Sequence, residues 1–362
     1  MPKSSTLDRR TFVGAATMLA AGGLLPGTRK LVAKADAHAG MPMAMQMEHG
    51  QTMAHGPSSP KDPVDGLKFG TPEPQPGGQV REYWISASSL KWNIAPTGRD
   101  DWMKMTVPRA TSFRAFAYQL YSPGFARALA APSIPGPMLE AEVGDVLVVH
   151  LRNADRRFGQ AITMHPHGVR YTPDYDGSHL GDYTRAGGFV APGEEFKYTW
   201  ECRPDSAGVW PYHDHGPNAT INTARGLFGS IVIREKGAPK PNVEQVLFLH
   251  SFPPPVTGLR ANFECINGRA WAGNTPTIRA KVGQTVAMHA IGLDGFFHTF
   301  HVHGHRWQKD GDGPNVDCVT VGPGETISAR WTEDNPGRWL YHCHVFAHQD
   351  SGMAGWYLVE PS

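Results

Sequence analysis

The sequence predicts an all-β protein that consists of two tandem Greek-key β-sandwich domains. Short runs rich in β-branched and aromatic residues, such as DVLVVHL, FKYTW and SIVIRE, are bounded by Gly, Pro, Asn and Asp, and no long helical periodicity occurs. The 362 residues include 41 Gly and 31 Pro, as expected for a sandwich with many turns. This length suits two domains of ordinary size rather than three.

An internal repeat supports the two-domain organisation. PMLEAEVGDVL from Pro137 recurs as PTIRAKVGQTV from Pro276, and APGEEFKYTW recurs as GPGETISARW. GVWPYHDH likewise matches GRWLYHCH, and GLFGSIVI matches GMAGWYLV. We therefore predict a first domain over residues 78–236 and a second over 243–362, joined by the short linker GAPKPN.

The N-terminus resembles a twin-arginine export signal over residues 1–39. LDRRTFVG is followed by the apolar run AATMLAAGGLLPG and by a small-residue cleavage region around Ala35 to Ala39. The run is interrupted by Gly and is shorter than the ~20 apolar residues of a membrane-spanning helix. We therefore expect export in the folded state and a periplasmic or secreted mature chain without a membrane span.

Residues 40–77 are predicted to form a disordered leader, because they contain too few bulky apolar residues to fold alone. The leader is rich in thioethers and imidazoles, namely Met41, Met43, Met45, Met47, Met53, His49 and His55. Thioethers suit Cu(I), so one hypothesis is copper capture or delivery. The alternative is an exposed leader without a metal role.

Charge and cysteine usage exclude several classes of function. The formal net charge of +1 provides no strong field, and nothing indicates nucleic-acid binding. Cys202, Cys265 and Cys318 lack the spacing of a zinc or redox motif. In an exported protein two of them could form a disulfide and leave one free thiol, and the sequence does not specify the pair.

The segment YHCHVFAHQDSGM near the C-terminus holds two kinds of metal ligand. Cys343, His348 and Met353 supply a thiolate, an imidazole and a thioether, which make a blue-copper ligand set once a distant His joins them. If Cys343 lies on a strand, its neighbours His342 and His344 point to the opposite face. They would then serve a different metal directly behind the first.

Three further clusters supply the remaining imidazoles. TMHPHG, PYHDHG and HTFHVHGH each contain His-x-His pairs, whose rings share one strand face as a shared metal requires. The residues are His165, His167, His213, His215, His298, His301 and His303. A lone His is more often a core or surface residue, but four ordered clusters with a correctly spaced Cys and Met indicate metal binding.

These four motifs resemble the copper-binding signature of multicopper oxidases, the family of laccases, ferroxidases and ascorbate oxidase. The resemblance implies cupredoxin-like domains and four coppers per subunit. It assigns His298, Cys343 and His348 to the type 1 copper, with Met353 as the weak axial ligand. The implied type 2 ligands are His165 and His301, and the implied type 3 ligands are His167, His213, His215, His303, His342 and His344.

The first domain has Asp214 where the second has Cys343, so the first domain can hold no blue copper. Its histidines are left to serve a cluster that both domain types share. The resemblance to two-domain laccases implies a homotrimer, in which each trinuclear cluster lies between domain one of one subunit and domain two of the next. The sequence alone does not exclude an intrachain cluster.

The resemblance implies a laccase-like oxidase that uses O2 and a small reducing substrate. The resemblance implies that His348 faces the electron donor and that Cys343 passes electrons toward the cluster, where O2 becomes water. Asp176 and Tyr171 match an acidic and a phenolic position beside the cluster of two-domain laccases, and we predict that both are catalytic. Capping of its own turn by Asp176 and simple packing of Tyr171 are the alternatives. Asp317 resembles an acidic position near the donor pocket.

Phenols and aromatic amines are the donors that the resemblance implies. Oxidation of Cu(I) or Fe(II) is the alternative, and the Met-rich leader favours Cu(I). A copper nitrite reductase is also a trimer of two cupredoxin domains, but it needs only type 1 and type 2 copper, so the surplus imidazoles argue against it. A non-catalytic copper-storage protein would not need a blue site joined to a cluster.

Overall fold

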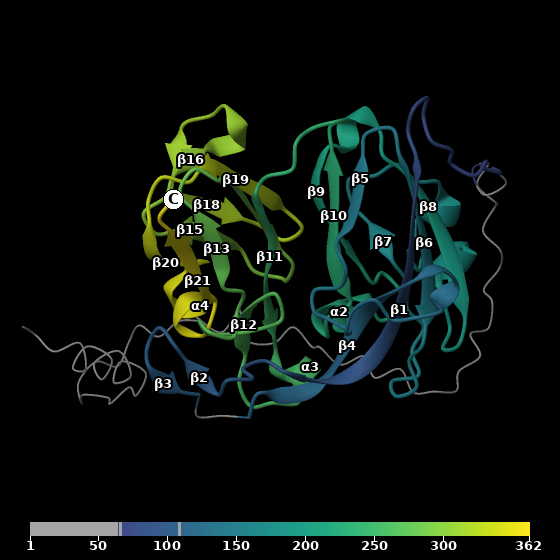
Figure 1. Cartoon of the computed structure of the whole chain (residues 1–362). Coiled ribbons are helices and arrows are strands. Elements are labelled where there is room, and N and C mark those ends of the chain that lie inside the picture. The colour runs from purple at the N-terminus through teal and green to yellow at the C-terminus, as the bar shows by residue number, and fades with distance from the viewer. Residues whose placement is uncertain (1–63, 65–66, 108–109) are drawn as a thin grey trace, which may run out of the picture. The chain divides into compact units, whose positions relative to one another are not determined.

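A computed structural model describes residues 64, 67–107 and 110–362, which form two sandwich domains in succession (Figure 1). The predicted export signal over 1–39 and residues 40–63 of the predicted leader lie outside the described residues. The all-β prediction is confirmed, since both domains consist of paired sheets. Among the described residues, no helix is long and apolar enough to cross a membrane.

The first domain contains two four-stranded sheets. Sheet 1 has the order β4 (Ser112–Tyr121), β1 (Val80–Asn93), β6 (Val146–Asn153) and β8 (Glu195–Glu201). Sheet 2 has the order β5 (Leu139–Glu142), β10 (Phe228–Arg234), β9 (Gly208–His213) and β7 (His165–Pro166). Within β6, Leu147, Val149 and Leu151 are fully buried while the intervening residues are partly exposed, so the period-two pattern builds the core.

The second domain repeats this arrangement. Sheet 3 has the order β12 (Phe263–Ile266), β11 (Val243–Phe252), β14 (Thr285–Gly292) and β19 (Thr326–Thr332). Sheet 4 has the order β13 (Ile278–Lys281), β21 (Ala354–Glu360), β20 (Gly337–Cys343), β15 (His298–Val302) and β18 (Cys318–Val321). Apart from the added β18, each strand has a counterpart in the first domain, and the parallel pairs β1–β6 and β5–β10 recur as β11–β14 and β13–β21.

In the part of the chain that the structure describes, helices and small sheets are confined to the connections between the sandwich strands. The α-helices are α2 (Ala219–Ala224), α3 (Pro254–Thr257) and α4 (Phe346–Asp350). The 3-10 helices are Pro123–Phe125, Pro173–Tyr175, Gly181–Tyr183, Ala186–Gly188, Pro204–Ser206 and Lys309–Gly311. Two short hairpins join β2 (Arg99–Asp100) to β3 (Met105–Thr106) and β16 (Trp307–Gln308) to β17 (Asn315–Val316).

Three apolar clusters set the order of the sheets. One lies between sheets 1 and 2 and includes Leu147 and Ile231. Another joins sheet 2 to sheet 3, where Val232 and Phe248 belong to the same buried cluster. The last lies between sheets 3 and 4 and includes Cys343. Sheet 4 therefore lies on the side of sheet 3 that faces away from the first domain, as Figure 1 shows.

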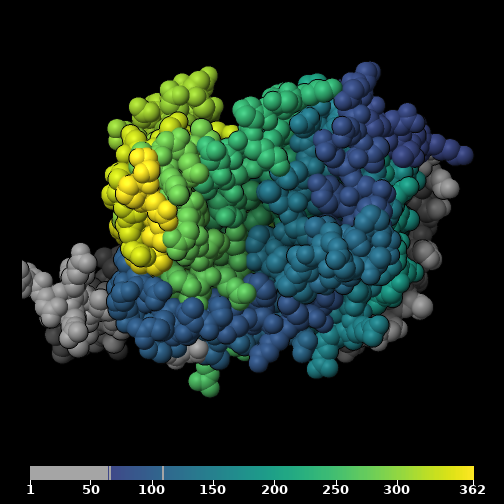
Figure 2. Space-filling model, viewed as in Figure 1, coloured from purple at the N-terminus to yellow at the C-terminus, as the bar shows by residue number. Residues whose placement is uncertain are grey.

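The hairpin β2–β3 belongs to the first domain but packs on the second. The backbone N–H of Asp101 donates to Ala272 O at 2.9 Å, and the Asn274 side chain donates to Arg99 O at 2.8 Å. In Figure 2 the blue atoms near residue 100 lie against green and yellow atoms of the second domain. The hairpin thus ties the two domains of one chain together near sheet 4.

Candidate metal centres

The predicted type 1 ligands come together at one end of the second sandwich. Cys343 Sγ lies 3.9 Å from His298 Nδ1 and 3.7 Å from His348 Nδ1. Cys343 and His298 are fully buried, whereas His348 on α4 is partly exposed. Met353 is buried in the same apolar cluster, and its carbonyl accepts the Cys343 N–H at 3.1 Å. A thiol, two imidazoles and a thioether fit copper.

Asp294 holds the second nitrogen of His298. Its Oδ1 lies 3.1 Å from His298 Nε2 and also accepts the Phe296 N–H at 2.9 Å. Burial opposes protonation of His298, but Asp294 and Cys343 outweigh it and raise the pKa of His298 to about 9. Outer carboxylates of this kind orient a ligating imidazole and increase its basicity.

His342 and His344 point away from Cys343, to the outer face of sheet 4. Strand pairing places His301 opposite His342 and Phe300 opposite Cys343, which fixes the two faces. His303 Nε2 and His342 Nε2 approach to 3.0 Å, and the His301 ring lies 5.5 Å from the His344 ring. These four rings form the second-domain half-cluster.

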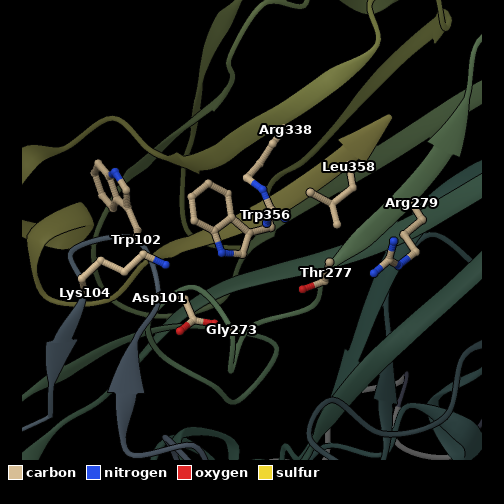
Figure 3. Close-up of a pocket in the computed structure, with 9 residues that line it drawn as sticks. All are labelled: Asp101, Trp102, Lys104, Gly273, Thr277, Arg279, Arg338, Trp356 and Leu358. Atoms are coloured by element: carbon tan, nitrogen blue, oxygen red, sulfur yellow. The ribbon is translucent and has the colours of Figure 1, made fainter. Parts of the chain in front are cut away.

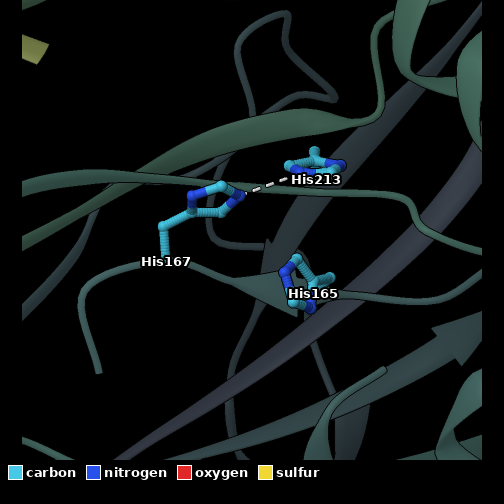
Figure 4. Close-up of side chains that lie close together, drawn as sticks. All are labelled: His165, His167 and His213. Carbon is cyan, nitrogen blue, oxygen red and sulfur yellow. Dashed lines mark hydrogen bonds between the residues drawn. The ribbon is translucent and has the colours of Figure 1, made fainter. Parts of the chain in front are cut away.

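The first domain carries a matching group on the outer face of sheet 2. His167 Nε2 lies 3.1 Å from His213 Nε2, and both rings lie near His165 (Figure 4). The His215 ring lies 5.1 Å from the His165 ring. We refer to His165, His167, His213 and His215 as the first-domain half-cluster.

Backbone carbonyls orient several of these rings. In four of them Nδ1 is hydrogen-bonded to a carbonyl oxygen, which leaves Nε2 free for a metal. The pairs are His165 with Asp176 O (2.8 Å), His213 with Asp214 O (2.8 Å), His301 with Asp317 O (2.6 Å) and His342 with Cys343 O (2.9 Å). Burial, together with the neighbouring rings, lowers the pKa of His167, His213 and His342 to about 4. The rings of His167, His213 and His342 are therefore neutral near pH 7, which is the form that binds a metal.

The two half-clusters do not meet within one chain. The first-domain half-cluster lies on the face of sheet 2 that adjoins sheet 3, and the second-domain half-cluster lies on the far face of sheet 4. Sheets pack roughly 10 Å apart, so the whole second sandwich separates the two groups. No ring contact joins a histidine of one half-cluster to a histidine of the other, although all eight residues are described.

Comparison with known proteins identifies the family. Models described as multicopper oxidase match residues 128–238 and 240–362. The chain belongs to the multicopper oxidase family. Among curated relatives, it is 28% identical to mouse hephaestin over an alignment of 349 positions, which covers 78% of this chain and 30% of hephaestin. It is also 28% identical over 244 residues to a probable nitrite reductase-hydroxylamine oxidoreductase fusion protein of Kuenenia stuttgartiensis, covering 63% of this chain and 28% of that protein.

Solved structures show the same fold. The blue copper oxidase from Nitrosomonas europaea has a TM-score of 0.60 at 25% identity, covering 78% of this chain and 86% of that chain. The copper nitrite reductase from Nitrosomonas europaea has a TM-score of 0.58 at 18% identity, covering 78% and 93%. The cupredoxin-like fold is therefore confirmed. This multicopper oxidase chain spans less than a third of the length of these two curated relatives.

Asp176 and Tyr171 lie beside the first-domain half-cluster of this multicopper oxidase. Asp176 Oδ1 is 3.2 Å from His165 Nδ1, and the Tyr171 ring is 5.7 Å from the His165 ring. Burial alone would raise the pKa of Asp176, but hydrogen bonds from His165 and Ser178 outweigh it and hold that pKa below its ordinary value. Tyr171 also lines a surface cavity with Arg170 and Arg203.

The first domain shows what replaces a blue site. Asp214 is fully buried in place of a thiolate, and its Oδ1 accepts the Thr163 N–H at 2.6 Å while Oδ2 accepts Asn222 Nδ2 at 3.3 Å. In the repeat, Ile162 and Leu227 occupy the positions of His298 and Met353. The counterpart of the type 1 site is therefore a hydrogen-bonded carboxyl in an apolar core.

Trp102 was not predicted as a site residue, yet the hairpin β2–β3 brings it to the second-domain half-cluster. Its ring lies 6.5 Å from the His342 ring at an interplanar angle of 30°. A cavity of about 650 Å³ adjoins it, lined by Lys104, Arg338 and Trp356 among others (Figure 3). No local signal predicts this contact, because the hairpin and β20 are distant in sequence. Asp294 was not predicted either, although its position four residues before His298 is a visible signal in the sequence.

All four cysteines are free thiols in the structure, and Cys202 and Cys265 are buried. The disulfide that the cysteine count left open is therefore not formed in the described structure. Burial raises the pKa of Cys202 to about 12, so it stays protonated and packs as an apolar residue.

Proposed function

We propose that this multicopper oxidase is a laccase-like enzyme that holds four coppers per subunit. The observation that carries the proposal is that three consecutive residues at the end of β20 point to two groups of potential ligands. Cys343, the last residue of β20, faces inward with His298 and His348, whereas His342 faces outward with His301 and His303. The ring of His344, which follows β20, lies 5.5 Å from the His301 ring. When bound, copper would accept single electrons at the Cys343 site and deliver them to O2 at the histidine clusters.

The chain's own residues would provide the electron path and the proton path. Peptide bonds join Cys343 directly to His342 and His344, which is a short covalent route between the sites. Asp176 lies within hydrogen-bonding reach of His165 and is half-buried, so it is placed to hand protons from solvent to the cluster. Tyr171, edge-on to the same ring, is placed to donate a hydrogen bond or an electron.

We propose that each cluster closes between two copies of the chain. Each half-cluster offers open imidazole nitrogens on one outer face, and His303 and His344 are exposed. Because the second sandwich lies between the halves of one chain, a neighbouring copy supplies the complementary half. A closed ring of such head-to-tail contacts is a cyclic oligomer, and the family resemblance favours a homotrimer.

Exposed aromatic rings favour phenolic or aromatic amine donors. Phe296, Phe297 and Phe346 are 60%, 58% and 67% exposed and lie in the segments that flank His348. The Phe296 ring is 6.5 Å from the His348 ring. Aromatic donors can stack on such rings within reach of the imidazole that receives the electron.

Metal-ion oxidation is the second candidate function. Asp294, which contacts His298, and the neighbouring buried Glu264 each keep one carboxylate oxygen without a hydrogen-bond partner. Such oxygens suit a metal cation. Some curated relatives are named ferroxidases, which agrees with this alternative. A nitrite reductase needs fewer imidazoles than the two half-clusters supply.

Copper content, absorption spectra and oxygen uptake test the proposal. Four coppers per chain, a blue thiolate band and a type 3 shoulder support it, and two coppers without the shoulder contradict it. Rates with a phenol, Fe(II) and Cu(I) measured side by side choose the donor class. The Cys343→Ser variant should lose both the blue band and oxygen uptake; uptake that persists would refute the electron path.

We also propose that the chain is exported, on the basis of the twin-arginine pattern in residues 1–39. Replacing Arg9 and Arg10 by Lys should retain the protein in the cytoplasm, as cell fractionation would show. Equal export of the wild-type and the Lys variant would refute the proposal.

A further inference from the structure

A buried polar network lies behind the second-domain half-cluster, and the proposed electron and proton paths do not use it. His305 Nδ1 lies 2.7 Å from the carbonyl oxygen of His303, and His305 Nε2 lies 3.0 Å from Glu333 Oε1. The hydroxyl of Tyr357 and the indole N–H of Trp331 both donate to Glu333 Oε2. The network thus runs from β21 to the backbone of a predicted type 3 ligand.

Glu333 is a fully satisfied buried carboxylate. Its side chain has 0% exposure, and that of His305 has 2%. Oε1 also accepts the Asn335 N–H at 3.0 Å, so each carboxylate oxygen has two partners. Burying such a group is costly unless all its hydrogen bonds are made, which means that the site is built around the carboxylate.

The duplicated first domain is an internal control for the role of this network. Alignment of HPHGV with HVHGH puts Val169 at the position of His305, and FKYTWEC with ISARWTE puts Cys202 at the position of Glu333. Ile231 takes the position of Tyr357, and each pairs with a Trp of the neighbouring strand, in the same register. The first sandwich forms the same strand order with apolar residues at all three positions, so the fold does not require the polar network.

The network instead holds the turn that carries the His303 ring. His305 binds the His303 carbonyl, and the Asn335 side chain donates to the Gly304 carbonyl at 3.2 Å. Glu333 holds both of these hydrogen-bonding groups in place, because it binds the His305 ring and the Asn335 N–H. We refer to the two hydrogen bonds to the His303 and Gly304 carbonyls as the clamp. Gly304 has φ 72°, a left-handed conformation that favours Gly. One carboxylate thereby fixes two consecutive carbonyls.

The clamp matters because the His303 ring has little packing of its own. His303 is exposed, yet its Nε2 lies 3.0 Å from His342 Nε2, as a shared metal position requires. The counterpart His167 is partly buried. Both residues make the same backbone hydrogen bond to the neighbouring strand: the His167 N–H donates to Pro211 O, and the His303 N–H donates to Leu340 O. The exposed ligand has the additional clamp.

We propose that Glu333 and His305 are positioning residues that fix His303 for cluster copper, an inference that rests on the proposed oxidase function. Outer hydrogen-bond partners of metal ligands typically contribute 10–100-fold in metal affinity. The network does not touch His298, Cys343 or His348, so the blue site should not depend on it.

The test compares two copper sites within one molecule. The full-length protein is loaded at graded copper concentrations as wild type, His305→Val, Glu333→Gln and His305→Gln. His305→Val installs the first-domain residue, and Arg306→Ala at the adjacent exposed position is the control. Cluster loading is followed by the type 3 shoulder and the type 2 paramagnetic signal, and the blue band of Cys343 is the internal reference.

We expect half-loading of the cluster in His305→Val and Glu333→Gln to need about 10–100-fold more copper, with an unchanged blue band. His305→Gln, which can still donate to the His303 carbonyl, should recover part of the affinity. Wild-type cluster loading in both variants would overturn the inference, as would parallel loss of the blue band, which would indicate a general role in stability. A wild-type chain that loads only the blue site would overturn the proposed oxidase and this inference together.

Discussion

Single side chains separate the two duplicated halves chemically. Cys343 and Asp214 occupy equivalent positions in the repeat, with equivalent neighbouring histidines. Cys343 is a soft thiol beside two imidazoles, whereas Asp214 is a carboxyl hydrogen-bonded to Thr163 and Asn222. Around Cys343, Asp294 adds a carboxylate that the first domain lacks. The chemical difference between the two halves therefore depends on a few residues on a common scaffold.

Asp294 should tune the blue site. In Asp294→Ala, His298 Nε2 loses its carboxylate partner, so copper affinity at the blue site should fall about 10–100-fold. The reduction potential should rise because the imidazole becomes a weaker donor. A redox titration of the blue band measures the shift. An unchanged potential and unchanged copper affinity would show that the Asp294 contact has no influence on the metal.

Asp145 should make stability depend on acid. It accepts hydrogen bonds from Gln79 N–H, Glu142 N–H and Arg81 Nε. Burial alone would raise the pKa of Asp145, but these partners outweigh it and lower that pKa. A lowered folded pKa means that the contribution is complete above the unfolded value of about 3.9 and is lost as pH falls through the folded value.

Asp145→Asn should therefore lower the free energy of unfolding by about 1–3 kcal/mol at neutral pH. The difference from wild type should shrink below about pH 4. Urea unfolding of the metal-free protein between pH 2 and 7 measures both. A difference that stays constant across this range would contradict the role assigned to the carboxylate.

Among the elements, the hairpin β2–β3 has the clearest link to the site. It leaves the first domain, packs on the loop around Ala272 and brings Trp102 to His342. Gly273 permits this approach, because a Cβ there would lie 2.4 Å from the Asp101 carboxylate. The position of the hairpin thus depends on a missing side chain in the opposite domain.

Gly273→Ala should displace the hairpin and destabilise the protein. Its φ of +93° adds strain of about 1–3 kcal/mol for any side chain, and the clash with Asp101 adds to it. Gly283→Ala is a matched control, because Gly283 has φ +91° but nothing within 4 Å of its Cβ position. Urea unfolding and proteolysis at the hairpin should distinguish the two variants. Equal behaviour would show that the hairpin contact adds nothing beyond backbone strain.

For the whole molecule, the order of the four sheets determines how a cluster can close. If each cluster joins two copies, a chain with His167→Ala and a chain with His303→Ala should complement each other when refolded together. About a quarter of randomly formed interfaces would then combine two intact halves. Oxygen uptake of the mixture compared with each variant alone measures this. Absence of any recovery in mixed oligomers would contradict the shared cluster.

The features that depend on local periodicity were predictable from sequence. Alternation along β20 placed Cys343 and His342 on opposite faces, and the repeat predicted two sandwiches of the same design. The contact of Trp102 with His342 was not predictable, because it depends on how a hairpin of one domain crosses to the other. The replacement of Val169 and Cys202 by His305 and Glu333 was visible in the repeat, but its meaning required the hydrogen bonds. The ligand assignments themselves stay predictions until copper is measured.

The placement of the half-clusters on the outer faces of sheets 2 and 4 has a consequence for the newly made protein. If the proposed function and the shared cluster hold, a lone chain would carry a complete electron-entry site but only separated halves of the oxygen site. Oxygen chemistry would then begin only on assembly, and specific activity would fall steeply on dilution below the concentration at which copies associate. The folded monomer would be inactive, and an increase in the concentration of the protein would activate it through association.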